Sequence, residues 1–416
     1  MFTLNGKYTN AVVYTDICEQ QAISQIIALC NHPVFDGAKI RIMPDVHAGI
    51  GCTIGTTIKL KEKKLIPNIV GVDIGCGVLT TIFKTSNSID FKKLDDFIKE
   101  NIPNGHGVQK RKHPNLDKNI QKQIKEIVSD LNLKELDYFI NSCGSLGGGN
   151  HYIEIGQLNN DTYSLSVHTG SRNLGKKVSK HFSLRAAFNM AGGEKLKKAE
   201  QELIANLKKE NKEKDINKEL INLRNNFADK IIGIPKDLAY IEGKDYESYI
   251  ENMIKCQNMA FENRRLISED ILNFLEVQAV EQFDTIHNYI EESNDSIIIR
   301  KGSISAKKGE KVAIPLNMKE GVIIAIGKGN YDWNQSAPHG AGRLLSRSDA
   351  KELLSMEDFK DDMDGINTWS VCEETLDESP QAYKPADLII EQIKETVDIL
   401  YIAKPVYNFK SKMIRK

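Results

Sequence analysis

The pattern of apolar and polar positions changes several times along the chain, and each change predicts a different kind of element. Residues 39–81 alternate short β-branched runs with glycine-rich turns, as in TIGTTIKL and NIVGVDIGCGVLTTIF, which is typical of buried strands with tight connections. Residues 90–101 and 119–141 carry apolar positions at helical spacing, and HYIEIGQL and YSLSVHTG return to a strand pattern. The chain is therefore predicted to be a mixed α/β (α+β) protein.

A stretch rich in lysine and glutamate follows, at about residues 186–236. Leu and Ile recur in it every three or four residues, so we predict a protruding helical hairpin. Its mixed-sign charge is typical of a solvated helix face, and an RNA-contacting arm is the alternative. We then predict a helix over residues 247–277, strands in IIIRKGSISAK and GVIIAIGKG, and an amphipathic helix over residues 386–401. We expect one catalytic domain over residues 1–416, with the hairpin as an insertion.

The composition indicates the general class of protein and says little about its activity. Of the 416 residues, 40% are hydrophobic, which is enough for a large core. Lys and Arg number 56 against 57 Asp and Glu, so binding of a polyanion needs a local basic patch. Seven cysteines without a CxxC pair favour a reducing compartment, and we expect the cytoplasm. No run approaches the roughly 18 apolar residues of a membrane span, so no membrane partner is expected.

The motif VGVDIGCG holds the first candidates for chemistry. Asp73 and Cys76 lie three residues apart, and Gly71, Gly75 and Gly77 permit a sharp bend of the backbone there. A carboxylate and a thiolate that converge at a strand end could form a corner of a metal site. The alternative is a buried structural cysteine beside an aspartate that caps a turn.

Four of the nine histidines stand in unusual surroundings: His151 after SLGGGN, His168 at the end of a strand, His287 in DTIHNYI, and His339 in APHGAGR. Each by itself could be a partly buried histidine with satisfied hydrogen bonds. Together with Asp73 and Cys76, three of them supply enough ligands for two divalent ions that share the thiolate, and two such ions suit chemistry at phosphorus. Zinc, manganese and iron all remain open on ligand type.

The glycine-rich segments CGSLGGGNH and HGAGR could bring backbone N–H groups close to phosphate oxygens, although plain turns are the alternative. Neither segment matches a P-loop, and the lysine motif of lysine-adenylating ligases is absent. A neutral imidazole can attack phosphorus, and a nearby guanidinium can hold charged oxygens. His339, followed by Arg343, is therefore the candidate nucleophile.

Taken together, these motifs resemble the RtcB family of RNA ligases. The matching blocks are MPDVHAGIG, VGVDIGCG, GGGNHYIEI, HTGSRNLG, IHNY, RKGSISA, HGAGR and AYK, in the family's order. The resemblance implies a single α/β catalytic domain with central β-sheets flanked by helices. It implies two Mn²⁺ ions held by Asp73, Cys76, His151, His168 and His287, a guanylylated His339, and GTP as cofactor. Arg172 lies where the family contacts RNA phosphate.

By the same resemblance, GTP contacts fall on a set of positions spread along the chain. They are Asn150, His151, Tyr152, Ile153, Glu154, His287, Asn288, Pro315, Leu316, Asn317, Met318, His339, Gly340, Ala341, Gly342, Arg343, Tyr383 and Lys410. The family's common PGSMG turn is here PLNMK, and Val322 replaces a usual hydroxyl residue. Ala337 and Pro338 precede His339 where cysteine and serine are frequent in the family. Lys412 and Lys416 are alternatives to Lys410 as the lysine that contacts the base.

Three functions are compatible with these residues. The resemblance implies an RNA ligase that joins 3′-phosphate or 2′,3′-cyclic phosphate ends to 5′-hydroxyl ends, in tRNA splicing or RNA repair. Its expected partners are RNA with such ends, including tRNA or rRNA fragments, and an archease-like activator. The altered PLNMK turn motivates a second hypothesis: the protein is a metal-dependent RNA-end phosphodiesterase without a nucleotidyl-histidine step. The third is a non-catalytic RNA-binding factor that docks through the lysine-rich insertion, and retention of every metal-ligand residue disfavours it.

Overall fold

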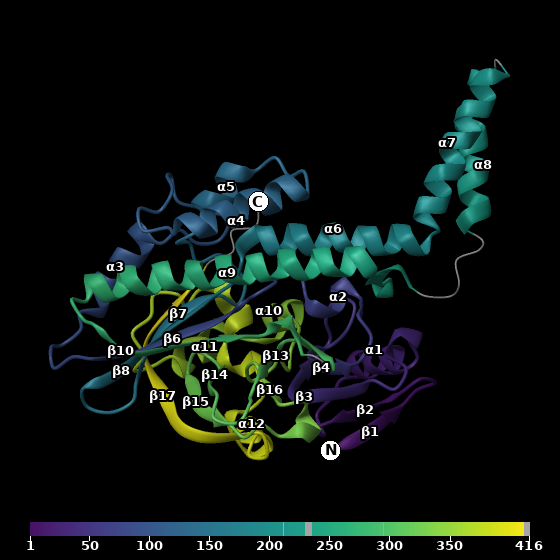
Figure 1. Cartoon of the computed structure of the whole chain (residues 1–416). Helices are drawn as coiled ribbons and strands as arrows, with labels where there is room; N and C mark the ends of the chain where they lie inside the picture. Colours follow the sequence, from purple (N-terminus) through teal and green to yellow (C-terminus); the bar gives the residue numbers. More distant parts are fainter. Residues whose placement is uncertain (211, 229–234, 294, 412–416) are drawn as a thin grey trace.

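The computed structural model describes residues 1–210, 212–228, 235–293 and 295–411. Two large sheets form the centre of the molecule, and several helices, including the longest, lie across one side of them (Figure 1). The six-stranded sheet has the order β1 (Phe2–Asn5), β2 (Asn10–Val13), β3 (Lys39–His47), β4 (Ile54–Leu60), β12 (Ile297–Lys301) and β11 (Asn288–Glu292). The predicted mixed α/β class is thereby confirmed.

The seven-stranded sheet carries most of the candidate site. Its order is β10 (Ala279–Ile286), β6 (Gly77–Lys84), β8 (Thr162–Thr169), β7 (Tyr152–Gln157), β17 (Val397–Lys410), β15 (Val322–Gly327) and β14 (Lys311–Pro315), and all neighbours are antiparallel. Two two-stranded sheets are also present: β13 (Ser303–Ser305) pairs with β16 (Ser336–Pro338), and β5 (Lys64–Leu65) pairs with β9 (Ile241–Glu242).

The two faces of the seven-stranded sheet differ because side chains alternate along a strand. Ile153 and Ile155 of β7 point into an apolar cluster that includes Ile267 and Ile271 of helix α9 (Gly243–Phe274). Helix α3 (Phe91–Asn101) contributes Leu94 and Ile98 to the same cluster. The opposite face carries polar side chains of β7, Tyr152 and Glu154.

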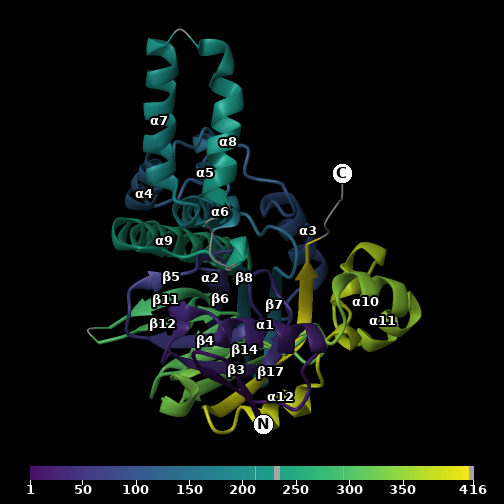
Figure 2. The same ribbon diagram turned by 90° about the vertical axis from the view of Figure 1, so that its right-hand side faces the viewer.

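The other helices surround this centre. They are α1 (Gln20–Cys30), α2 (Pro67–Val70), α4 (Lys118–Asp130), α5 (Leu136–Asn141), α6 (Arg172–Met190), α7 (Gly193–Lys209), α8 (Ile216–Ala228), α10 (Arg347–Leu353), α11 (Met356–Asp362) and α12 (Ala386–Gln392). Helices α6 and α9 lie side by side over the sheets (Figure 1). Helices α10 and α11 lie together at the side of the molecule (Figure 2). No described helix is both long and apolar enough to cross a membrane.

The lysine-rich stretch forms the predicted hairpin. Helices α7 and α8 pack against each other and project away from the sheets in both views (Figures 1 and 2). Only Gly193 and Leu207 of α7 are buried, which agrees with a solvated pair of helices.

Two of the helix predictions were wrong in part. Residues 119–141 form two helices, α4 and α5, because Asn132 adopts a left-handed conformation with φ of 51° that ends α4. Residues 386–401 form a helix only as far as Gln392, and Val397 begins β17. This strand pairs with β7 on one side and β15 on the other, so its position between two strands outweighs the local helical pattern.

The remaining predictions agree with the structure. Residues 39–81 contain β3, β4 and β6, with the short helix α2 and the two-residue β5 between them. HYIEIGQL and YSLSVHTG form β7 and β8, and GVIIAIGKG contains β15. IIIRKGSISAK divides into β12 and β13 at Gly302, where φ is 57°. The helix predicted over residues 247–277 is α9.

Candidate active site

Four neighbouring strands of the seven-stranded sheet each bring one side chain to the same edge. His287 directly follows β10, Cys76 directly precedes β6, His168 lies near the end of β8, and His151 directly precedes β7. Because these strands are antiparallel neighbours in the order β10-β6-β8-β7, the end of one lies beside the start of the next. The topology therefore gathers residues that are far apart in the sequence.

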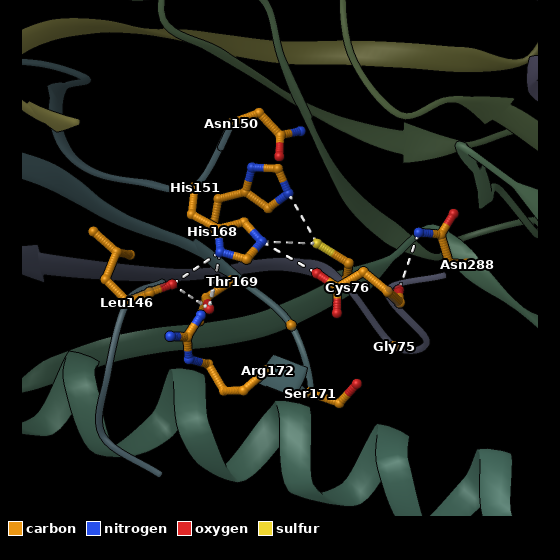
Figure 3. A network of polar contacts seen from close by, with 12 residues as sticks. Gly75, Cys76, Leu146, Asn150, His151, His168, Thr169, Ser171, Arg172 and Asn288 are labelled. Carbon is orange, nitrogen blue, oxygen red and sulfur yellow. Dashed lines mark hydrogen bonds and ion pairs between the residues drawn. The ribbon is translucent and has the colours of Figure 1, made fainter. Parts of the chain in front are cut away.

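The gathered side chains form two overlapping sets with the dimensions of metal sites. Asp73, Cys76 and His151 form one set, and Cys76, His168 and His287 form the other; within each set the ligand atoms lie within 4.8 Å of one another. The Cys76 Sγ lies 3.5 Å from His151 Nε2 and 3.4 Å from His168 Nε2. Figure 3 shows both imidazole rings directed at the sulfur. Cys76 is thus placed to be shared between two cations.

Hydrogen bonds and burial determine which atoms of these side chains carry protons, and therefore which can bind a metal ion. The Nδ1 of His151 lies 2.9 Å from the Leu146 carbonyl oxygen, so it carries the ring proton and leaves the Nε2 lone pair towards Cys76. Burial lowers the pKa of His168 well below its usual value, which keeps this imidazole neutral. Burial and the Asp73 carboxylate raise the pKa of the Cys76 thiol well above its usual value, so the thiolate requires a compensating cation. A thiolate, imidazoles and a carboxylate suit divalent transition metals.

His339, the candidate nucleophile, follows β16 and is held by Asp45 of β3. The Nδ1 of His339 lies 2.6 Å from Asp45 Oδ2, and the His339 backbone N–H donates to the same oxygen at 3.0 Å. Asp45 is fully buried, and its carboxylate accepts the Nδ1 proton, which leaves Nε2 as the free nucleophilic atom. The His339 ring centroid is 4.7 Å from that of His287, so the candidate nucleophile adjoins the second ligand set.

A cavity of about 470 Å³ extends from His339 along the polar face of the sheet. Most of the residues expected to contact nucleotide line it: Asn150, Tyr152, Glu154, Pro315, Leu316, Asn317, Met318, His339, Gly340, Ala341, Gly342, Arg343, Tyr383 and Lys410. Its volume lies within the usual range of small-ligand sites.

Four side chains from β7 and β17 form the floor of this cavity. Tyr152 and Glu154 alternate with core residues on β7, and Lys410 and Asn408 lie directly opposite them on β17. Asn408 Nδ2 donates to Glu154 Oε2 at 2.9 Å. Burial raises the pKa of Glu154 to about 8, while Asn408 and Lys410 act against this rise.

Glu378 organises the cations on the wall of the cavity. It accepts hydrogen bonds from Lys410 Nζ at 2.6 Å and from the Tyr383 hydroxyl at 2.7 Å, and it pairs with Arg347 at 2.7 Å. Burial raises its pKa, but Lys410, Arg347 and Arg343 outweigh this effect and lower it to about 2. Glu378 thus remains ionised and fixes three donors around the cavity.

Arg172 begins α6 beside the metal-ligand sets (Figure 3). Its Nε donates to Ser145 Oγ at 3.0 Å and its Nη2 to the Gly105 carbonyl at 3.2 Å. Burial lowers the pKa of the guanidinium, while the charge of the Asp73 carboxylate acts against this; both hydrogen bonds go to neutral acceptors. A largely buried arginine with only neutral acceptors is suited to receive an anion such as a phosphate.

The chain was compared with known proteins. The sequence model of the family described as tRNA-splicing ligase RtcB matches residues 25–411, a range that includes every residue of the site described above. The chain belongs to the RtcB family. The RNA-splicing ligase RtcB of Escherichia coli K12 is 28% identical to it, and the alignment covers 94% of each chain. The tRNA-splicing ligase RtcB of Nanoarchaeum equitans is 25% identical, over 89% of this chain and 86% of the relative.

Four of the positions expected to contact GTP in this RtcB-family protein do not line the cavity. His151 and His287 belong to the metal-ligand sets. Asn288 donates from Nδ2 to the Asp73 carbonyl at 3.1 Å and accepts from the Gly302 N–H, so it positions the first set. Ile153 points to the apolar face of the sheet, away from the cavity, because of strand alternation. Lys412 and Lys416 lie outside the described residues.

Sequence reasoning missed four residues of this RtcB-family site: Asp45, Arg347, Glu378 and Asn408. Asp45 stands in MPDVHAGIG, a block that matched the family, so its signal was present without an assigned role. Glu378 precedes AYK by four residues and offers no chemical pattern of its own. Asn408 becomes informative only once the register between β17 and β7 is known.

Proposed function

We propose that this protein is a GTP- and Mn²⁺-dependent RNA ligase that joins 3′-phosphate or 2′,3′-cyclic phosphate ends to 5′-hydroxyl ends through a nucleotide carried on His339. The observation that carries this proposal is the position of His339. Asp45 holds its Nδ1, it adjoins a double set of metal ligands, and it lines a cavity sized for a nucleotide. Relatives named as RNA-splicing and tRNA-splicing ligases support RNA as the substrate.

In the first step, His339 Nε2 attacks the α-phosphorus of GTP. A P–N bond forms, the bond to the bridging oxygen breaks, and pyrophosphate leaves. The imidazole gains positive charge as the bond forms, and the buried Asp45 carboxylate at Nδ1 stabilises this charge. Divalent cations held by Asp73, Cys76, His151, His168 and His287 would offset charge on the phosphate oxygens.

The next two steps transfer the nucleotide and join the RNA. An oxygen of the RNA 3′-phosphate attacks the phosphorus on His339, the P–N bond breaks, and free His339 is restored. The 5′-hydroxyl oxygen then attacks the RNA 3′-phosphorus and loses its proton, and GMP leaves as the 3′,5′ bond forms. A 2′,3′-cyclic phosphate is first opened by water to the 3′-phosphate. Arg172 is suited to hold an RNA phosphate beside this chemistry.

Two further expectations stay with this proposal. The reaction takes place in the cytoplasm, because free cysteines, including the central Cys76, suit a reducing compartment. An archease-like protein is proposed as an activator, and tRNA or rRNA fragments as the RNA.

The test uses two short RNAs, one ending in a 3′-phosphate and one beginning with a 5′-hydroxyl, incubated with the purified protein, Mn²⁺ and GTP. Joined RNA that requires both GTP and Mn²⁺ is the expected result. Opening of a cyclic phosphate without GTP, and without any joined product, would instead identify the metal-dependent phosphodiesterase. The variant Asp73→Ala tests the part played by the metal ligands. It removes a ligand of one set and leaves His339 and the cavity floor in place.

A further inference from the structure

The floor of the cavity contains three neighbouring polar atoms with unused hydrogen-bonding capacity. The Tyr152 hydroxyl, Glu154 Oε1 and Asn408 Oδ1 are all buried, and none has a hydrogen-bond partner among the described residues. All three residues line the cavity, and Asn408 is only 1% exposed. Buried polar atoms normally have partners, so three together indicate the place where a polar ligand binds.

The orientation of the Asn408 amide follows from its neighbour. Asn408 lies directly opposite Glu154 in the pairing of β17 with β7, so both side chains stand on the same face of the sheet. Asn408 Nδ2 donates to Glu154 Oε2 at 2.9 Å, and the nitrogen is the only atom of the amide that can donate. The amide oxygen is left as an acceptor beside the free Glu154 Oε1.

We propose that Asn408 is a specificity-determining residue, whose amide oxygen accepts a hydrogen bond from the 2-amino group of guanine; this inference rests on the proposed function. Asn408 was not among the residues that the sequence suggested for GTP binding. It has two tasks in this role. Its nitrogen fixes the Glu154 carboxylate, and its oxygen binds the base.

The hydrogen-bonding pattern of the bases explains the preference. The Watson–Crick edge of guanine presents two donors, N1–H and the 2-amino group, which match two adjacent acceptors, Glu154 Oε1 and Asn408 Oδ1. Adenine presents an acceptor at N1, which finds no donor on Glu154 when that carboxylate is ionised, the form that binds guanine. Hypoxanthine, the base of ITP, keeps N1–H and lacks only the 2-amino group. ITP therefore separates the contribution of Asn408 from that of Glu154.

The experiment compares GTP with ITP as donors for covalent labelling of the full chain in Mn²⁺, using nucleotides labelled at the α-phosphate. For the wild type, labelling efficiency, as kcat/KM, is expected to be about tenfold or more higher with GTP, because ITP leaves a buried acceptor unpaired. In Asn408→Leu, which keeps the shape and removes the amide, the ratio is expected to fall to within about twofold of one. GTP should remain preferred over ATP as long as Glu154 is present.

Asn367→Ala is the matched control, since Asn367 is an exposed asparagine that contacts the same strand through the Val406 carbonyl. It should retain the wild-type ratio of GTP to ITP. Equal labelling of the wild type by GTP and ITP would overturn the inference even if Asn408→Leu failed to fold, as would an unchanged ratio in a folded Asn408→Leu. Absence of label from GTP in the wild type would overturn the proposed function itself, and is thus distinguishable.

Discussion

At the scale of single residues, Asp45 decides which nitrogen of His339 is free to react. Its Oδ2 accepts both the Nδ1 proton and the backbone N–H of His339. Asp45→Asn would keep an oxygen for these two hydrogen bonds but remove the negative charge that stabilises the imidazole as the P–N bond forms. We expect the rate of covalent labelling with GTP to fall about a hundredfold or more, as measured by single-turnover kinetics at saturating GTP. A rate within threefold of the wild type would contradict this role of Asp45.

Glu154 gives the nucleotide site a dependence on pH. In the proposed GTP site, the guanine N–H donors would bind the ionised carboxylate. Burial raises the pKa of Glu154 to about 8, so below this pH most of the free protein holds a proton there. Binding of GTP must release that proton, and affinity should therefore increase with pH and level off above about 8.

Between pH 6 and pH 8 the increase in GTP affinity should be about fiftyfold, which titration with a fluorescent GTP analogue can measure. Glu154→Gln has no proton to lose at this position, so its affinity should hardly vary over the same range. An equally steep pH dependence in Glu154→Gln would assign the proton to another group.

At the scale of elements, the strands that build the site were predictable and their partners were not. HYIEIGQL and YSLSVHTG show the alternation of β7 and β8 directly in the sequence. By contrast, the local sequence pattern of residues 397–401 is typical of the end of a helix. Only pairing with both β7 and β15 makes these residues part of β17. Since Asn408 and Lys410 reach the cavity through that pairing, this half of the site depends on non-local contacts.

The metal-ligand residues were proposed from unusual local sequence and from the resemblance, whereas their convergence depends on strand order. Cys76 and His287 are 211 residues apart in the sequence, yet they flank the paired strands β6 and β10. Asp45 and His339 likewise come from distant segments, with a sequence separation of 294 residues. A register between strands is set by the packed sheet, and no property of a single segment reveals it.

The hairpin of α7 and α8 is expected to be dispensable for the nucleotidyl step. Helix α6 already contacts the segment Lys236–Leu238, so a short Gly-Ser linker can replace residues 192–234. Because α7 buries only Gly193 and Leu207, we expect the melting temperature to change by only a few degrees and labelling with GTP to stay within about twofold.

A control in which only the exposed Lys197 and Lys198 are changed to Ala would keep the hairpin and remove two positive charges. If deletion of the hairpin lowered RNA joining while labelling persisted, and the double variant did the same, the hairpin would be an RNA-contacting arm. Loss of folding on deletion would contradict the view that the rest of the protein folds without the hairpin.

At the scale of the whole molecule, four antiparallel strands and the loops at their ends bring Cys76 and the three histidines to one edge. A cation bound there ties these strands together and should stabilise the fold by linkage, by about 2.7 kcal/mol at a hundred times its dissociation constant. We therefore expect Mn²⁺ to raise the melting temperature of metal-free protein and a chelator to reverse this. Cys76→Ala should lose most of the effect, because Cys76 belongs to both ligand sets. An unchanged shift in Cys76→Ala would place the cation elsewhere.

The whole account depends on a nucleotide carried by His339, and one measurement tests this most directly. Purified protein is incubated with α-labelled GTP and Mn²⁺ and separated under denaturing conditions, with His339→Ala beside it and Arg343→Lys as a variant that keeps the nucleophile. We predict a covalent label on the wild type, a weaker label on Arg343→Lys, and none on His339→Ala. Absence of label on metal-loaded wild type, or an undiminished label on His339→Ala, would contradict the account.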